Sequence, residues 1–224
     1  MRIGTLGAGN MADALATQWA RAGHEVFIGA RTPAKAEALA ARIGAGARGG
    51  TLGEAAEFGE AVLLAVWWEA APDVVEAVAD ALDGKVLIDC TNPTGPPDFT
   101  LRTGGGPSAA QRIADAARGG ARVVKAFNTC HESVWRLTPP VFGGRPLGVP
   151  LCGDDADALD AVRGLVRDIG CEPVDGGGLD RAGLLEATTA FAIGVWAAGG
   201  DPAAMFPPVE TAGPPPVKTA AQAP

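Results

Sequence analysis

Three small residues near the start of the chain have the spacing that binds the pyrophosphate of a dinucleotide. Gly7, Gly9 and Ala12 follow an apolar run and open a stretch with helical character. In G-x-G-x-x-A, the first glycine permits a tight turn, the second lets the backbone approach a pyrophosphate, and the alanine lets the helix lie close to the strand. The N–H groups at the start of the helix then face the phosphates. The alternative is a glycine-rich turn without a ligand. The expected cofactor contacts are Gly7, Gly9, Asn10, Met11 and Ala12.

The segment after the next apolar run indicates which dinucleotide this turn would hold. NAD sites usually place an acidic residue there for the ribose hydroxyls. Here the run continues into GARTPAK, which has no acid, and Arg31 stands in its place with Thr32 and Lys35 nearby. A guanidinium can hold a phosphate through two hydrogen bonds and stack on adenine. The sequence therefore predicts NADP(H) rather than NAD(H), and a solvated surface arginine is the alternative.

Strand-length apolar runs alternate with alanine-rich helical stretches along the first half of the chain. The runs are continuous rather than alternating in polarity, which is typical of parallel strands covered on both faces. They lie at 2–7, 25–30, 61–67, 85–90 and 121–127. The helical stretches lie at 10–22, 33–43, 52–58, 70–82 and 107–118. This order predicts an α/β fold of the Rossmann-like, doubly wound type with a mainly parallel sheet.

The second half of the chain adds smaller parts. We expect two more strands on either side of a helix at 155–169, and then an apolar helix of about 179–198. From Asp201 the composition becomes rich in proline, which is typical of a flexible tail. The predicted organisation is an NADP-binding Rossmann-like domain, a C-terminal helical segment and a Pro-rich, flexible tail, with boundaries at 1–176, 177–200 and 201–224.

The bulk composition excludes several classes of protein. A length of 224 residues suits one α/β domain, and a net charge of −8 argues against a nucleic-acid partner, because duplex-binding proteins usually have a basic surface. No secretory signal is apparent and residues 183–200 are barely long enough to span a bilayer, so we predict a cytoplasmic protein with no membrane partner. The spacing of the four cysteines fits no zinc site, so we expect no metal. These are Cys90, Cys130, Cys152 and Cys171.

Five segments together resemble the F420-dependent NADP oxidoreductase family, and also the oxidoreductase domain of the STEAP metalloreductases. The glycine-rich turn alone is generic. DCTNP before a long Gly/Pro loop and KAFNT after a strand are more specific when they occur together. The likeness covers about residues 1–200, and the segments that carry it are GTLGAGNMADALA, IGART, VLIDCTNP, RVVKAFNT and LEATTAFAIGVWAAGG.

The resemblance implies an NADP-dependent oxidoreductase, a homodimer, and direct hydride transfer between nicotinamide C4 and C5 of the deazaflavin F420. The residues implied to meet the 2′-phosphate are Arg31, Thr32 and Lys35. Those implied to line the hydride site are Ala126, Phe127, Asn128 and Thr129, with Ala126 and Asn128 also in contact with the cofactor. Those implied to flank the cofactor are Val66, Trp67, Trp68, Asn92 and Pro93. All of them fall at predicted strand ends, where open α/β sheets bind ligands.

Direct hydride transfer requires little of the side chains beyond orientation and the exclusion of water. Asn128 and nearby backbone groups are candidates to fix the carboxamide or the acceptor. His131 is the one candidate proton donor close in sequence, although we favour the simpler interpretation of a histidine at a loop or helix start. Trp67 and Trp68 point to opposite sides of an extended segment, so we expect one in the core and the other over the cofactor pocket. The alternative is that both lie in the core.

The sequence leaves several acceptors open for the second half of the site. F420 has an acidic tail, and the candidates for its positive partner are Arg102, Arg145 and Lys125. The same fold would also suit a flavin, a quinone, or an imine or enone of a specialised metabolite. A non-catalytic NADP(H)-binding sensor is a further alternative, in which a tryptophan fills the acceptor cleft. We treat Cys130 as structural, and Asp89 and Glu186 are candidates for burial.

Overall fold

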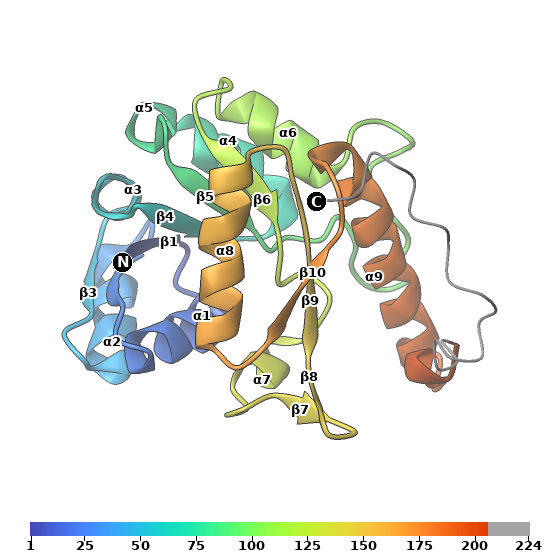
Figure 1. Ribbon diagram of the computed structural model, residues 1–224. Coiled ribbons are helices and arrows are strands. Elements are labelled where there is room, and N and C mark those ends of the chain that lie inside the picture. The colour runs from blue at the N-terminus through green and yellow to red at the C-terminus, as the bar shows by residue number, and fades with distance from the viewer. Residues whose placement is uncertain (206–224) are drawn as a thin grey trace.

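The computed structural model describes residues 1–205, and eight of its strands form one sheet (Figure 1). In chain order these strands are β1 (Arg2–Leu6), β2 (Glu25–Gly29), β3 (Arg48–Gly50), β4 (Ala61–Leu64), β5 (Val86–Asp89), β6 (Arg122–Lys125), β9 (Gly148–Gly153) and β10 (Glu172–Asp175). They are arranged in the order β10-β9-β6-β5-β4-β1-β2-β3. The six strands from β6 to β3 are parallel, β9 is antiparallel to β6, and β10 is parallel to β9. Because the strand order reverses direction between β1 and β4, the predicted doubly wound, Rossmann-like fold is confirmed.

Helices cover both faces of this sheet. They are α1 (Asn10–Arg21), α2 (Pro33–Ile43), α3 (Leu52–Phe58), α4 (Ala71–Glu76), α5 (Ala79–Leu82), α6 (Ala109–Ala116), α7 (Glu132–Trp135), α8 (Ala156–Asp168) and α9 (Ala182–Ala197). Three 3-10 turns, η1 (Trp68–Ala70), η2 (Leu179–Arg181) and η3 (Pro202–Met205), join or extend them. One buried cluster contains side chains of α1, α2 and α8, and a second contains those of α3, α4 and α6. The sheet therefore lies between two cores, as in other α/β folds.

The predicted strands and helices are present, with two kinds of error. The five predicted parallel strands end one to three residues earlier than expected, because their last residues already belong to the loops at the C-terminal edge. The single helix predicted at 70–82 is wrong: the chain forms η1, α4 and α5 there, and Val78 leaves the helical conformation with φ −125° and ψ 16°. Local alanine content does not reveal this break.

Two short elements gave no clear signal in the sequence. Strand β3 contains two glycines and no apolar run, and it pairs at the edge of the sheet with β2. A small hairpin joins β7 (Val141–Phe142) to β8 (Arg145–Pro146). Gly143 and Gly144 form its turn with φ of 57° and 76°, as a two-residue hairpin loop requires. The pair of glycines could have predicted this hairpin.

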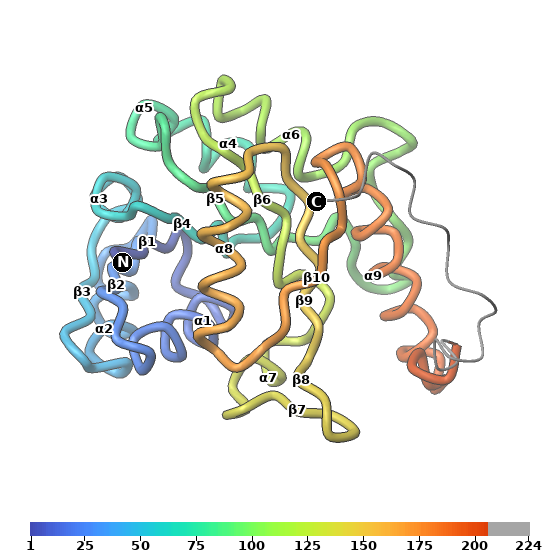
Figure 2. Tube along the Cα trace, in the orientation of Figure 1, coloured from blue at the N-terminus to red at the C-terminus, as the bar shows by residue number. Residues whose placement is uncertain are grey.

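The apolar helix α9 lies to the side of the sheet, at the right in Figure 2. It packs on the long loop that follows β5: a Cβ added at Gly183 would lie 3.5 Å from Ser108 Cβ, and one added at Gly194 would lie 4.0 Å from Phe99 Cβ. None of the helices within residues 1–205 combines the length and the apolar character that crossing a bilayer requires. Of the tail predicted from Asp201, residues 206–224 lie outside the described residues.

Candidate functional site

The glycine-rich turn lies between β1 and α1, at the C-terminal edge of the sheet. Gly7 has φ 120°, and a Cβ there would lie 2.2 Å from Ala65 O, so the protein itself requires glycine at this position. Gly9 is exposed at the N-cap of α1, and a Cβ there would meet no protein atom within 4 Å. The open space at Gly9 therefore fits a group from outside the chain, such as a pyrophosphate at the helix N-terminus.

The end of β2 places three polar side chains beside this turn. β1 and β2 are parallel, and Gly7 N donates a 2.9 Å hydrogen bond to Gly29 O. Arg31, Thr32 and Lys35 follow at the start of α2, and all three are exposed. Within residues 1–205, the side chains of Arg31 and Lys35 make no hydrogen bond or ion pair. Two cations without a protein partner at a helix start are suited to a 2′-phosphate.

Helix α7 is attached to the start of α1, which brings the end of β6 close to the turn. Asn10 Nδ2 donates to Glu132 Oε1 at 3.0 Å, and Arg136 Nη1 donates to Asp13 Oδ2 at 2.6 Å. Asp13 also pairs with Arg42 at 3.0 Å, so the other arginines nearby are already engaged. This contrast strengthens the assignment of a ligand to the cations at the end of β2.

The segment after β6 turns two of its side chains into the core. Ala126 and Phe127 are fully buried. The Phe127 ring packs edge-on against Trp19 and Trp135, with centroids 5.7 and 5.5 Å away, and its φ of 61° is uncommon for a bulky residue. Any contact from Ala126 and Phe127 to a ligand would therefore come from backbone atoms. The half-buried Thr129 follows Asn128 in the same loop.

Asn92 and Asn128 join the ends of β5 and β6. Asn128 Nδ2 donates to Asn92 Oδ1 at 2.9 Å and to Thr189 Oγ1 at 3.3 Å, while Asn92 Nδ2 donates to Asn128 O at 2.7 Å. Asn128 is 2% exposed, and its Oδ1 has no hydrogen-bond partner. An unpaired buried acceptor costs about 1–3 kcal/mol. The N–H of a carboxamide would satisfy it, so this pair fits the amide of a nicotinamide.

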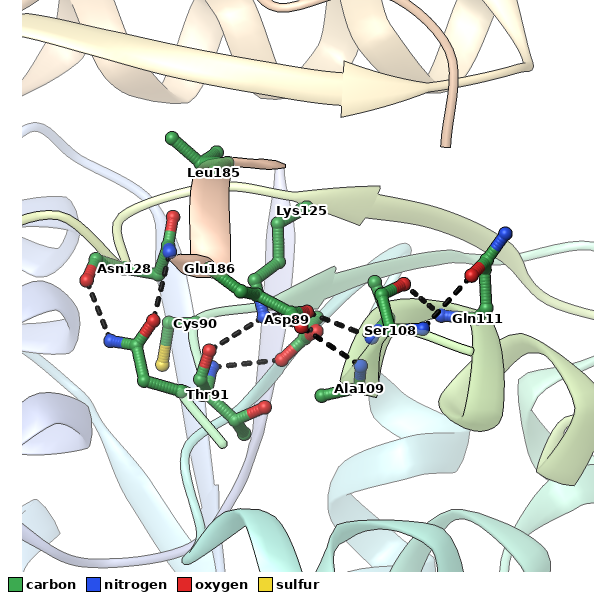
Figure 3. A network of polar contacts seen from close by, with 12 residues as sticks. Asp89, Cys90, Thr91, Ser108, Ala109, Gln111, Lys125, Asn128, Leu185 and Glu186 are labelled. Atoms are coloured by element: carbon green, nitrogen blue, oxygen red, sulfur yellow. Dashed lines mark hydrogen bonds and ion pairs between the residues drawn. The ribbon is translucent and has the colours of Figure 1, made fainter. Parts of the chain in front are cut away.

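A buried ionic cluster lies next to Asn128 (Figure 3). Lys125 Nζ contacts Asp89 Oδ2 at 2.8 Å, Thr91 O at 2.6 Å and Glu186 Oε1 at 3.0 Å, and the three charged side chains are fully buried. Burial alone would lower the pKa of Lys125, but the carboxylates of Asp89 and Glu186 outweigh it and raise that pKa. The expectation that Lys125 meets the acidic tail of an acceptor is therefore wrong, because Lys125 has no exposed surface.

Glu186 attaches α9 to the start of α6. Its carboxylate accepts hydrogen bonds from Ala109 N at 3.0 Å and Ala110 N at 3.1 Å, in addition to its contact with Lys125 (Figure 3). Thr189, three residues further along α9, accepts the bond from Asn128. The sequence indicates Glu186 as a candidate for burial but does not indicate its pairing with Lys125. A single charge in an otherwise apolar helix was the available signal.

The tryptophans after β4 have different surroundings. The Trp67 side chain is 80% exposed, whereas Trp68 is half-buried and its Nε1 is buried without a hydrogen-bond partner. The alternative in which both lie in the core is therefore wrong. Val66 lies at the glycine-rich turn, since a Cβ at Gly7 would be 3.2 Å from Val66 Cγ1. Pro93 is buried in the loop after β5, and its carbonyl accepts a hydrogen bond from Arg102 N at 2.7 Å.

The remaining candidate cations differ in what they contact. Arg102 Nη2 donates to the carbonyls of Gly95 at 3.0 Å and Pro96 at 2.7 Å, so its guanidinium closes the loop after β5. Arg145 lies on the exposed hairpin strand β8. His131 is the N-cap of α7, where Nδ1 accepts from the backbone N–H of Ser133 at 3.3 Å. The interpretation of His131 as a helix-start histidine is confirmed.

Cys130 is half-buried beside this loop. Burial raises the pKa of its thiol, which therefore stays protonated near neutral pH. A structural role agrees with this environment. Within residues 1–205, no group of three or more His, Cys, Asp or Glu side chains could hold a metal ion.

Comparison with known proteins adds a chemical context to this geometry. Residues 2–93 match the family described as NADP oxidoreductase coenzyme F420-dependent. The chain is 34% identical over 213 residues to the F420-dependent NADP reductase of Methanothermobacter marburgensis, which covers 86% of this chain and 91% of that protein. It is 32% identical over 196 residues to metalloreductase STEAP3 of Rattus norvegicus, but these cover only 38% of that longer protein.

Two solved structures agree closely with the fold. A candidate F420-dependent NADP-reductase from Arthrobacter sp. FB24 has a TM-score of 0.76 and 28% identity, over 89% of this chain and 95% of that one. A hypothetical protein from Sinorhizobium meliloti has a TM-score of 0.72 and 31% identity, over 82% of this chain and 87% of that one. The likeness to the candidate reductase therefore covers most of this chain and is not limited to the glycine-rich turn.

Proposed function

Because this chain belongs to the family of F420-dependent NADP reductases and is an NADP-dependent oxidoreductase, we propose that it transfers a hydride between NADP(H) and the deazaflavin F420. The observation that carries the proposal is the open space at Gly9, at the N-terminus of α1, together with the nearby cations Arg31 and Lys35, which have no protein partner. The likeness to the reductases supports the choice of acceptor.

The residues of the chain bind and orient the dinucleotide along the edge of the sheet. The N–H groups at the start of α1 hold the pyrophosphate over Gly9, and Arg31, with Thr32 and Lys35, holds the 2′-phosphate. Asn128 Oδ1 accepts a hydrogen bond from the carboxamide, and the contact with Asn92 keeps the Asn128 amide in place. When bound, NADPH supplies a hydride from C4 of its nicotinamide ring.

The acceptor side is formed by the loops after β4, β5 and β6. The Phe127 ring packs against Trp19 and Trp135 in the core and would hold the backbone of the loop after β6 in place. The indole of Trp67, which is 80% exposed after β4, would cover the bound rings and exclude water from them. The reaction then depends on close, dry stacking of two flat rings rather than on an acid or a base.

We further propose that the chain forms a homodimer through α9. Leu184 and Phe191 lie on one face of this helix and are 60% and 65% exposed, while Trp196 near its C-terminal end is 68% exposed on a different side. Glu186, the one charged residue of α9, is buried on the opposite side against Lys125. An apolar helix face without charge is usually covered in solution, and a second copy of α9 offers a surface of the same character.

One observation favours a different acceptor. Lys125 is buried and Arg102 is engaged with its own loop, so two of the three cations considered for the acidic tail of F420 are occupied. An acceptor without an anionic tail, such as a flavin, a quinone, an imine or an enone, would not need them.

Mixing the protein with NADPH and oxidised F420 tests the proposed function. We expect the deazaflavin absorbance to disappear in proportion to the NADPH consumed. Tight binding of NADPH without any loss of that absorbance would overturn the assignment of F420 and favour one of the tail-free acceptors or a sensor. Failure to bind NADPH would overturn the whole proposal.

A further inference from the structure

The buried ionic cluster has one carboxylate more than it needs for neutrality. Lys125, Asp89 and Glu186 are all fully buried, and one ammonium faces two carboxylates. All three protons of the ammonium have acceptors, namely the two carboxylates and the carbonyl of Thr91. The N-terminus of α6 contributes a partial positive charge through Ala109 N and its neighbour. A surplus of negative charge remains.

This surplus lies next to the atoms that we assign to the nicotinamide. Thr91 N donates to Asp89 Oδ1 at 2.8 Å, and Thr91 is followed directly by Asn92. Asn92 in turn pairs with Asn128, which is three residues after Lys125 on the neighbouring strand end. Figure 3 shows Asn128 beside Thr91 and the ionic cluster. No solvent-exposed side chain takes part in the cluster.

The two redox forms of the cofactor differ in charge at this position. The nicotinamide ring is neutral in NADPH and carries a positive charge in NADP⁺. A fixed negative charge in a poorly polarisable interior stabilises a nearby cation more strongly than it would in water. It therefore affects the two redox forms unequally, whereas hydrogen bonds to the carboxamide are available to both.

We propose that the surplus carboxylate charge of the Asp89–Lys125–Glu186 cluster stabilises the oxidised nicotinamide, so that the chain favours hydride donation by NADPH. The inference rests on the NADP(H) site of the proposed function and is independent of the acceptor. Glu186 does not touch the cofactor in this account: it is a positioning residue that holds Lys125 and α9 in place and supplies half of the carboxylate charge.

The test is the ratio of two dissociation constants, Kd for NADP⁺ divided by Kd for NADPH, measured by calorimetric titration of each form. In E186Q the ratio should rise about fivefold, which is the order expected for one unit charge acting through a partly polar interior. D89N removes the other carboxylate and should move the ratio in the same direction. Binding of NADPH should change much less than binding of NADP⁺ in both variants.

A matched control separates charge from simple loosening of α9. T189V removes the acceptor of the Asn128 bond from the same face of α9 and leaves the cluster charge intact. It should weaken both redox forms alike and leave the ratio unchanged. An equal ratio shift in T189V, or no shift in folded E186Q and D89N, would overturn the proposal.

Two further outcomes are informative. If one of E186Q and D89N fails to fold, as judged by its thermal unfolding, the other carries the test, and an unchanged ratio in that folded variant overturns the proposal. If the unmodified protein binds neither NADP⁺ nor NADPH, the proposed function fails first, and that result is distinct from an unchanged ratio.

Discussion

Individual residues at the sheet edge differ in whether the protein or a ligand determines their identity. Gly7 is required by the fold, since a Cβ would collide with Ala65 O. The same is true of Gly4, where a Cβ would meet Ala55 O in α3. Gly9 has open space instead, and Arg31 is an arginine without a protein partner. These two positions therefore report on the ligand rather than on stability.

Replacing Gly9 with alanine should leave the fold intact and weaken the dinucleotide. A methyl group at this position meets no protein atom but occupies the space of the pyrophosphate. We expect the dissociation constants of NADPH and NADP⁺ to rise at least about tenfold, with the melting temperature changed by only a few degrees. Gly4→Ala is the matched control and should lower the melting temperature strongly. Undiminished NADPH binding by Gly9→Ala would place the pyrophosphate elsewhere.

Replacing Arg31 with glutamate should reverse the choice of dinucleotide. The guanidinium is lost and a carboxylate repels the 2′-phosphate, whereas it can accept from the ribose hydroxyls of NADH. We expect NADPH binding to fall about a hundredfold and NADH binding to change little, as measured by fluorescence titration. Arg21→Glu, the same change at the C-terminal end of α1 and therefore far from the glycine-rich turn, is the control. Equal losses for NADPH and NADH would rule out a 2′-phosphate at Arg31.

At the scale of elements, local signals predicted some helices well. The prediction of 52–58 agrees with α3 because Thr51 and Glu54 form a capping box at its start. The prediction of one helix at 70–82 is wrong because Val78 leaves the helical conformation, and the alanine-rich composition on either side does not indicate that break. The sequence does not predict β3, because two of its three residues are glycines and it has no apolar run. It is a strand only through its pairing with β2 at the edge of the sheet.

The candidate site shows the same division between local and distant causes. The glycine spacing and Arg31 can be identified as candidates from the sequence alone, because each depends only on the residues of one turn or one strand end. Lys125 was misjudged because its partner Glu186 belongs to α9, which is distant in the sequence, and only the folded sheet edge brings the two together. Phe127 was expected beside the nicotinamide, but its unusual φ, which no local pattern announces, turns its ring into the core.

At the scale of the whole molecule, α9 joins the sheet on one side and presents an apolar face on the other. Glu186 and Thr189 anchor the helix to the start of α6 and the end of β6, next to the proposed nicotinamide site. Leu184 and Phe191 point outward. If a second copy covers them, the subunit interface and the redox site share one helix, and dimer formation supports the geometry of the site.

Placing a charge on the outer face of α9 tests this arrangement. Phe191→Glu would bury a carboxylate without a partner in the proposed interface, which is strongly unfavourable. We expect the unmodified protein to be a dimer and Phe191→Glu to be a monomer in light scattering at micromolar concentration. Glu172→Gln, an exposed change on β10, is the control and should remain dimeric. A monomeric unmodified protein, or a dimeric Phe191→Glu, would contradict the proposed interface.

The transfer of deuterium from the cofactor tests the central claim most directly. The protein is incubated with oxidised F420 and NADPH that carries deuterium at one of the two C4 positions, and the reduced deazaflavin is analysed by mass spectrometry. Since the account requires hydride to pass directly between stacked rings, one of the two labelled cofactors should deliver its deuterium to F420 and the other should not. Reduced F420 without deuterium from either labelled cofactor would contradict direct transfer.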